Sequence, residues 1–325
     1  MKGQPKDGPE TEKQYRMPPP LCRGDRVAIF SPSSHSGKNP AEYLSQAREL
    51  LTDWGLVPEP LEDPERRHLY LAGTDAERAE TFQRLYMDPG IKALFAARGG
   101  YGAARMIPLL DGDKLAAAPP CWVVGMSDVT ALFAYLGRLG TGTMHGPCLA
   151  APAHNESPHK EENQEFLRQA LFDPQMREEH TCGLLHRPPG TPDTLRGPLV
   201  GGCLSVLASG MGTPWELESR GAVMLLEDVD EAPYRIDRYI TQLRQAGAFQ
   251  GVAAVVFGHL KNCDGSPPGL LAQVLRDLFS GAPFPVLTGL QAGHGEINRA
   301  LPLGREVELD LRNALPGELC SLCQT

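Results

Sequence analysis

Short apolar runs alternate with amphipathic stretches through the first half of the chain. The run at 25–34 predicts a strand ending in small polar residues, and 40–55 has apolar positions at helical spacing before a glycine. A short strand over 56–62 follows, and then a helix over 73–88 that Thr74 can cap. Three further strands are predicted at 91–100, 121–128 and 141–147. Strands separated by helices form parallel βαβ units, so the pattern predicts a layered α/β domain.

The composition changes between about 151 and 195, where proline, histidine and polar residues surround one helical segment at 165–173. Such a change favours a crossing between domains. Beyond it, strands and glycine-rich turns are predicted at 197–212, 221–231 and 251–260, with a helix over 235–247. The first residues are polar, rich in proline and aperiodic, which is typical of a disordered leader and not of a signal peptide. We therefore expect a leader at 1–20, an N-terminal domain at 21–165, a crossing at 166–195 and a C-terminal domain at 196–325.

Composition and charge narrow the function classes. The 325 residues are 41% hydrophobic and 22% charged, as in ordinary soluble proteins, and the formal net charge of −9 disfavours binding of nucleic acid through its phosphates. No apolar run is long enough for a transmembrane helix. The eight cysteines have irregular spacing, which indicates reduced thiols in a cytoplasmic protein. The terminal CSLC (320–323) lacks the partners of a zinc site, so we interpret it as two thiols in a frayed tail.

Ser127 is the first candidate for chemistry. In VVGMSDVTALFAYLG it follows an apolar strand and a turn glycine and precedes a helix, the setting in which a nucleophilic serine faces the N–H groups of a helix N-terminus. The pattern G-x-S-D meets only half of the hydrolase signature G-x-S-x-G. Taken alone, Ser127 is more commonly explained as a helix N-cap.

A nucleophilic serine needs a base, and the base needs a carboxylate to orient it. Among the nine histidines, His294 stands out because a glycine on each side exposes it on a loop. His145 and His259 end apolar strands, and we expect the remaining six to be solvated: His35, His68, His154, His159, His180 and His186. For the carboxylate, Glu227 and Asp228 end an apolar strand on opposite faces, and alternation does not choose between them.

The glycine-rich stretch ARGGYG follows another strand. It lacks the lysine of a phosphate-binding loop and the spacing of a dinucleotide-binding motif. Close glycines can also bring backbone N–H groups against an acyl oxyanion. Strand ends carrying SPSS, ARGGYG and GMSD should meet at the carboxyl edge of the sheet, where ligands bind in such folds.

Taken in order, RGGYGAAR, VVGMSDVTAL, TMHGP, LVGGCLSVL, LLEDVDEAPYRIDRYITQL, FGH and AGHGEINRALPLG resemble the serine LD-carboxypeptidase family, the muramoyltetrapeptide carboxypeptidases, which includes the microcin-immunity peptidases. The resemblance spans about 24–309. It implies a flavodoxin-like N-terminal domain, a smaller mixed α/β C-terminal domain, and a triad assembled across their interface. It implies a homodimer, a cytoplasmic location suited to cell-wall peptide recycling, and no cofactor or metal.

By the same resemblance, Ser127 is the nucleophile, Glu227 the acid and His294 the base, with Gly100 and Asp128 giving backbone N–H groups to the oxyanion. The substrate would be the murein tetrapeptide, cleaved before its terminal D-alanine through an acyl-enzyme. We add that Arg98, beside the glycine loop, can bind a substrate carboxylate.

Two positions depart from the family pattern. Met126 replaces a frequent aromatic residue, and Cys203 stands where asparagine is common. Three alternatives remain: an immunity-type peptidase acting on peptidyl or aminoacyl nucleotides, a non-catalytic flavin- or nucleotide-binding module, and an inactive scaffold. The first tends to carry aromatic residues in an insertion, and 151–195 has no Trp or Tyr. The intact triad positions disfavour the last.

Overall fold

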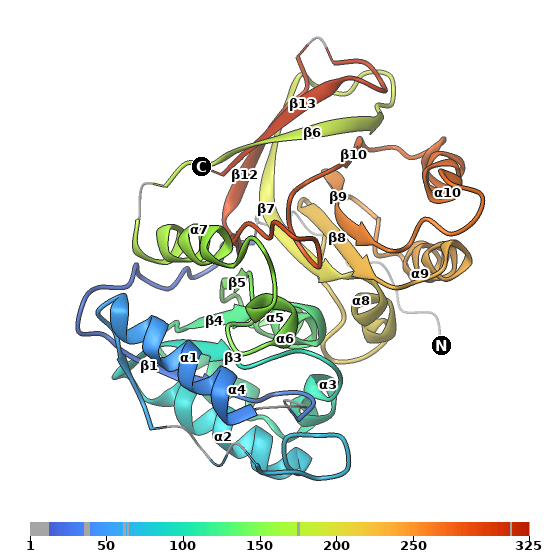
Figure 1. Cartoon of the computed structure of the whole chain (residues 1–325). Helices are drawn as coiled ribbons and strands as arrows, with labels where there is room; N and C mark the ends of the chain where they lie inside the picture. The colour runs from blue at the N-terminus through green and yellow to red at the C-terminus, as the bar shows by residue number, and fades with distance from the viewer. Residues whose placement is uncertain are drawn as a thin grey trace.

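The computed structural model describes residues 13–35, 40–60, 63, 65–173, 176–312 and 314–324. A layered α/β domain forms the lower half of the molecule and a β-barrel with three outer helices the upper half (Figure 1). The prediction of an α/β chain with a layered N-terminal domain and a second, smaller mixed domain is confirmed.

The N-terminal sheet has the strand order β11-β5-β4-β3-β1-β2. Its parallel strands are β1 (Arg26–Phe30), β2 (Val57–Pro58), β3 (Ile91–Ala96), β4 (Trp122–Gly125) and β5 (Thr143–His145). Their order 2-1-3-4-5 is that of flavodoxin-like folds, in which the strand order reverses between β1 and β3. The loops after β1, β3 and β4 therefore meet at the same edge of the sheet.

Both faces of this sheet are covered by helices, because side chains alternate along its buried strands. Val27 and Ile29 pack with α1 (Pro40–Asp53) and α7 (Lys160–Phe172). The opposite face packs with α2 (Asp75–Met87), α3 (Ala103–Met106) and α5 (Thr130–Arg138). This second core continues without a break into the barrel, so the two halves share one hydrophobic interior.

The barrel closes in the order β10-β6-β13-β12-β7-β8-β9. Its strands are β6 (Glu179–His186), β7 (Thr194–Cys203), β8 (Val223–Val229), β9 (Ala254–Lys261), β10 (Val286–Thr288), β12 (Glu306–Asp310) and β13 (Leu319–Gln324). Its accompanying helices are α8 (Leu204–Gly210), α9 (Pro233–Gln245) and α10 (Leu270–Phe279). Neighbouring β7, β8 and β9 run parallel, so their carboxyl ends also share an edge.

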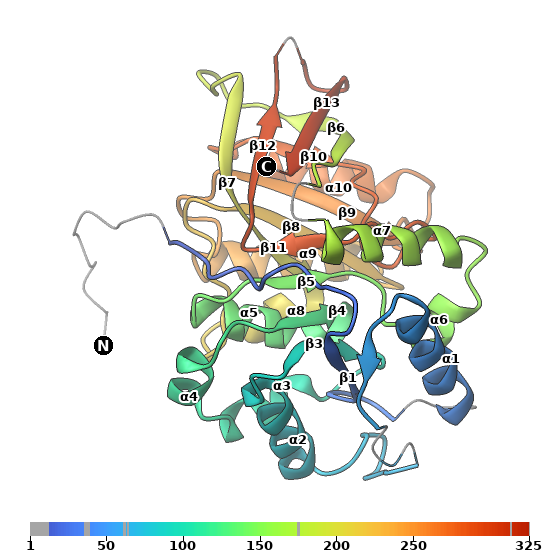
Figure 2. The ribbon, with the colours of Figure 1, turned by 90° about the vertical axis from the view of Figure 1, so that its left-hand side faces the viewer.

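One strand crosses between the halves. β11 (Leu301–Leu303) comes from the C-terminal part of the chain and pairs antiparallel with β5, where it forms the last strand of the N-terminal sheet (Figure 2). The segment directly before β11 contains His294. This pairing fixes the histidine loop beside the strands of the N-terminal domain.

Three expectations about the ends of the chain and the crossing differ from the structure. Residues 13–20 of the expected leader are packed, since the backbone N–H of Arg16 donates to the carbonyl of Gly140 and the Trp122 indole donates to the carbonyl of Pro19. Residues 1–12 lie outside the described residues. The expected crossing at 166–195 contains β6, which belongs to the barrel. The CSLC segment is not a frayed tail: it lies on β13 between β6 and β12 because Cys320 and Leu322 face the barrel core.

All eight cysteines carry free thiols. Within the described residues, no helix is long and apolar enough to cross a membrane.

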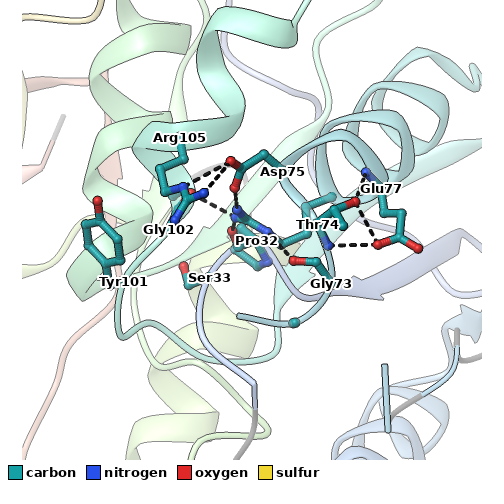
Figure 3. A network of polar contacts seen from close by, with 12 residues as sticks. Pro32, Ser33, Gly73, Thr74, Asp75, Glu77, Tyr101, Gly102 and Arg105 are labelled. Carbon is teal, nitrogen blue, oxygen red and sulfur yellow. Dashed lines mark hydrogen bonds and ion pairs between the residues drawn. The ribbon is translucent and has the colours of Figure 1, made fainter. Parts of the chain in front are cut away.

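Helix α2 begins as the sequence predicts. Thr74 accepts from the backbone N–H of Glu77 at 3.2 Å, and the Glu77 carboxylate accepts from the backbone N–H of Thr74 at 2.7 Å (Figure 3). This reciprocal capping box satisfies two N–H groups that the first turn of a helix leaves without partners.

Replacing the cap should weaken the fold measurably. We expect Thr74→Ala to lower the free energy of unfolding by about 1 kcal/mol, because an N–H at the start of α2 loses its acceptor. Urea unfolding followed by circular dichroism measures the change, and Thr74→Ser, which keeps the hydroxyl, is the control. Equal stability of the alanine variant and the unmodified protein would contradict the capping role.

Candidate active site

Ser127 lies in a strained turn between β4 and the helical segment that continues into α5. Its φ of +60° lies in the left-handed region that residues with a side chain seldom adopt. A 3-10 turn over Ser127–Val129 leads directly into α5. The serine hydroxyl is therefore presented at a sharp strand-to-helix turn, half-exposed, as the sequence predicts for a nucleophile.

The three predicted strand-end loops meet at this turn. A Cβ added to Gly99 would lie 2.8 Å from the Cβ of Ser127 and 3.0 Å from its Oγ, so the glycine loop touches the serine only because residue 99 lacks a side chain. Tyr101 donates its backbone N–H to Ser34 Oγ at 3.0 Å, which joins the loops after β1 and β3. The predicted meeting of SPSS, ARGGYG and GMSD is confirmed.

The side chain of Asp128 holds this arrangement together. Its Oδ2 accepts from the hydroxyl of Ser33 at 2.6 Å and from the backbone N–H of Ala103 at 2.8 Å. Asp128 is buried, so these bonds compensate a carboxylate that has left water. The carboxylate is thus occupied by structural bonds.

A second network supports the same loops from α2. The guanidinium of Arg78 is fully buried and donates to the carbonyls of Pro32, in the loop after β1, and Gly102, in the loop after β3. Asp75 pairs with Arg78 and also accepts from Arg105 at 2.8 Å (Figure 3). Burial is the largest effect on the Arg78 guanidinium and lowers its pKa. One buried cation therefore connects the ends of β1 and β3.

Glu227 and Asp228 point to opposite sides of β8, as alternation requires. Glu227 Oε2 accepts from His294 Nδ1 at 2.6 Å, whereas Asp228 Oδ2 accepts from the backbone N–H of Ser205 at 2.8 Å. The register between β8 and β9 shifts between Leu226 and Asp228, so Glu227 is left without a partner residue on β9. The structure thus brings Glu227, and not Asp228, to the histidine.

The glycines beside His294 have a different role from the one that the sequence analysis gives them. Gly293 has a φ of +102°, and a Cβ there would collide with Oε2 of Glu227; a Cβ at Gly295 would collide with the ring of His259. The glycines let the loop approach Glu227 closely, and the His294 side chain is only 18% exposed. His259 donates Nε2–H to the carbonyl of Ile297 at 3.0 Å and orders the same loop.

Glu227 and His294 strongly affect each other's pKa. Burial would raise the pKa of Glu227, but attraction to His294 and hydrogen bonds outweigh it and bring this pKa to about 2. Burial would lower the pKa of His294, but the charge and the hydrogen bond of Glu227 raise it above its ordinary value. An ionised carboxylate therefore orients Nδ1 of the imidazole and increases its affinity for a proton at Nε2.

The histidine loop reaches the serine turn through an asparagine that the sequence analysis does not single out. Asn298 Oδ1 accepts from the backbone N–H of Gly293 at 2.9 Å, and its Nδ2 lies 3.2 Å from Sδ of Met126. Its backbone N–H donates to Asn163 on α7 at 2.8 Å. In the sequence, the only sign of this link is the asparagine at the end of GHGEIN.

The other predicted residues lie around the turn. Arg98 Nη1 donates to the carbonyl of His35 at 3.1 Å, and its Nη2 lies against Gly100. Cys203 is buried opposite Glu227 across β7 and β8, and its backbone N–H donates to Thr130 Oγ1 at 3.0 Å.

Three of the six histidines expected to be solvated are buried: His35, His154 and His180. Desolvation lowers the pKa of both His154 and His180 to about 4. Polar neighbours in the sequence gave no sign of this because packing against distant segments decides burial. No group of three or more His, Cys, Asp or Glu side chains in the described part of the chain is arranged to hold a metal ion.

Both halves of the chain match domain families of known proteins. The profile of the LD-carboxypeptidase N-terminal domain matches residues 27–146, and that of the C-terminal domain matches residues 196–309. A relative from Streptomyces coelicolor is 40% identical over 92% of this chain and 94% of its own. The murein tetrapeptide carboxypeptidase of Pseudomonas aeruginosa is 31% identical over 88% and 93%.

Two solved structures share the fold. The muramoyltetrapeptide carboxypeptidase from Oxalobacter formigenes superposes with a TM-score of 0.78 at 27% identity, covering 92% of this chain and 98% of its own. The microcin C7 self-immunity protein MccF in complex with aspartyl sulfamoyl adenosine gives a TM-score of 0.80 at 25% identity, covering 94% and 97%.

The coupled pair should make stability depend on pH. The lowered pKa of Glu227 stabilises the fold above its unfolded value of 4.5, and this contribution is lost as the pH falls toward about 2. The raised pKa of His294 stabilises the fold below its unfolded value of 6.5, and this contribution is lost as the pH rises through the folded value. We expect the stability difference between the unmodified protein and Glu227→Gln to be largest between pH 4.5 and 6.5. Urea unfolding at a series of pH values measures it, and a constant difference would contradict the coupling.

Proposed function

The chain belongs to the LD-carboxypeptidase family, and on that premise we propose that it is a serine carboxypeptidase that removes the terminal D-alanine from murein tetrapeptides. The observation that carries the proposal is the 2.6 Å hydrogen bond between His294 Nδ1 and the buried carboxylate of Glu227. That bond leaves Nε2 of the imidazole as the basic atom, in a loop that contacts the residue preceding Ser127.

The proposed reaction is acyl transfer in two steps. Nε2 of His294 takes the hydroxyl proton as Ser127 Oγ attacks the carbonyl carbon before the terminal D-alanine, and Glu227 stabilises the imidazolium. The tetrahedral intermediate collapses, the C–N bond breaks, and the leaving amine takes the proton from His294. Water, deprotonated by His294, then attacks the ester and releases the tripeptide acid from Ser127.

The backbone N–H groups of Gly100 and Asp128 are the proposed oxyanion donors. Asp128 follows the serine in the first helical turn, and Gly100 follows the glycine that touches the serine. Donors fixed by secondary structure need no reorganisation when charge develops on the carbonyl oxygen. The buried networks of Asp128 and Arg78 support this arrangement because they hold both donor segments in place.

Removal of the nucleophile or the base should abolish turnover. We expect Ser127→Ala and His294→Ala each to lower the rate of D-alanine release from a tetrapeptide by about 10⁶-fold, because the members of a triad act as a unit. Released D-alanine is quantified by mass spectrometry. Ser209→Ala and His186→Ala are the matched controls, because these side chains bond to the carbonyls of Val206 and Ala282 and not to Ser127, Glu227 or His294. Substantial activity in either triad variant would disprove the assignment.

A substrate panel distinguishes this proposal from the immunity-type alternative, which the similarity to MccF supports. We expect release of the terminal residue from tetrapeptides ending in D-alanine, and none from tri- or pentapeptides or from peptides with an L-terminal residue. Cleavage of an aminoacyl sulfamoyl adenosine without tetrapeptide cleavage would favour the alternative. The homodimer and the cytoplasmic location remain predictions.

Arg98 is the proposed partner of a substrate carboxylate. Its guanidinium lies against Gly100, beside the proposed oxyanion donors, and is only partly buried. A carboxypeptidase must recognise a free terminal carboxylate, and the planar fork of a guanidinium binds one through two hydrogen bonds. One of its nitrogen atoms is already held by the carbonyl of His35, which fixes the direction of the fork.

If Arg98 binds the substrate carboxylate, its replacement should weaken substrate binding more than it slows the chemical step. We expect Arg98→Met to raise KM about tenfold or more with a smaller change in kcat, since a hydrogen bond to a charged group contributes about 1.5–3 kcal/mol. Arg98→Lys should recover only part of the loss because an ammonium cannot form the fork. Steady-state kinetics on the tetrapeptide measures both. If kcat falls and KM stays unchanged, Arg98 does not bind the ground-state carboxylate.

A further inference from the structure

A second histidine lies beside the proposed catalytic acid. His145 ends β5 and is fully buried, and its Nε2 lies 3.6 Å from Oε1 of Glu227, which is also fully buried. Its Cα is paired with Gly125 on β4 and with Leu301 on β11. His145 therefore stands between the strand that leads to Ser127 and the strand that follows the His294 loop.

The polar atoms of this second contact lack other partners. Glu227 uses Oε2 for both of its hydrogen bonds, to Nδ1 and to the backbone N–H of His294. Among the described residues, Oε1 of Glu227 and both ring nitrogens of His145 are buried without a hydrogen-bond partner. A buried carboxylate oxygen without a donor is costly, and an approach of a few tenths of an ångström would give it one.

The aromatic ring of Phe133 on α5 lies 6.4 Å from the His145 ring, centroid to centroid. The charges of Asp228 on β8 and Lys261 on β9 act on His294, and the charge of Glu227 acts on the buried thiol of Cys203 on β7. Glu227 is the group to which His145 can donate.

We propose that His145 is a positioning residue that donates its Nε2–H to Oε1 of Glu227 and so fixes the plane of the carboxylate that orients His294. The inference rests on the proposed function, because it assigns His145 to the same triad. With donors on both oxygens, the carboxylate cannot rotate away from the imidazole of His294. The strand β5 would thereby align the acid from the N-terminal domain while β8 supplies it from the barrel.

Loss of the His145 donor should shift the pH dependence of kcat/KM in one direction. A donor on Oε1 withdraws charge from the carboxylate, so its removal makes Glu227 more basic and His294 harder to deprotonate. The acid limb of kcat/KM, which reports the free base, should therefore move to higher pH. Loss of orientation should lower kcat, since a displacement of about 1 Å can cost about 100-fold.

The test uses two variants of the full-length protein. His145→Met removes the donor and keeps a flexible apolar filling, and His145→Gln keeps an N–H donor at a similar reach. For His145→Met we expect kcat to fall about tenfold or more, KM to stay nearly unchanged and the acid limb of kcat/KM to move up. His145→Gln should recover most of kcat and the original limb. Equal defects in both variants, or an unmoved limb in His145→Met, would overturn the proposal.

His180→Met is the matched control for a purely structural effect. His180 is buried with Nε2 3.8 Å from Oε2 of Glu178, a similar pair that does not touch Ser127, Glu227 or His294. Its replacement should lower stability without moving the pH limb. A limb that moves equally in both variants would mean that any buried histidine has this effect, and would count against His145.

Two readouts keep this test separate from the proposed function. A fluorophosphonate phosphonylates an activated serine with loss of fluoride, and mass spectrometry follows the rate of this reaction at Ser127 without a peptide. If Ser127 reacts but no D-alanine is released, the substrate assignment fails and the His145 comparison still holds. If Ser127 does not react, the triad itself fails. In the unmodified protein, nitrogen-15 NMR should show a proton on Nε2 of His145; a proton on Nδ1 alone would overturn the donor role.

Discussion

The contact between Glu227 and His294 is the constraint that the rest of the site satisfies. A fully buried carboxylate stays ionised only if it is paired and hydrogen-bonded, so the segments that carry its partners must approach Glu227 closely. The register of β8 against β9 shifts at Glu227, and the absence of a side chain at Gly293 lets the histidine loop contact the Glu227 carboxylate. The pairing of β11 with β5 then holds this loop against the N-terminal domain. The register shift, Gly293 and the crossing strand thus all act on the surroundings of one desolvated charge.

Two of the three catalytic candidates, Ser127 and Glu227, are each followed by an aspartate that makes structural hydrogen bonds. Asp128 follows Ser127 and binds the hydroxyl of Ser33 and the N–H of Ala103, and Asp228 follows Glu227 and binds the N–H of Ser205. In both places one residue faces the site while its neighbour satisfies the backbone N–H of a helix start. In each dipeptide, the first residue is a catalytic candidate and the aspartate that follows it stabilises the surrounding backbone.

The sequence predicted the elements whose signals are local. Periodicity located β1, β3, β4 and α2, and the sequence predicted Thr74 as the cap of α2, whereas the reciprocal bond of Glu77 was seen only in the structure. The choice of Glu227 over Asp228 came only from family resemblance, because alternation separates two faces without naming either. β11 could not be predicted, since a three-residue strand has almost no pattern and its partner is far away in sequence. The burial of His154 and His180, and the link through Asn298, likewise arise from distant packing that local polarity does not encode.

The position of β11 also bears on how the protein is made. Residues 301–303 complete the edge of a sheet whose other strands all lie before residue 146, so the N-terminal sheet lacks its last strand until most of the chain has left the ribosome. During synthesis the segment with Ser127 emerges well before Glu227 and His294, and the strand that closes the sheet comes just after the histidine. A fragment ending near the crossing would expose the open edge of β5. Closure of this sheet and the arrival of the proposed histidine base therefore coincide late in biosynthesis.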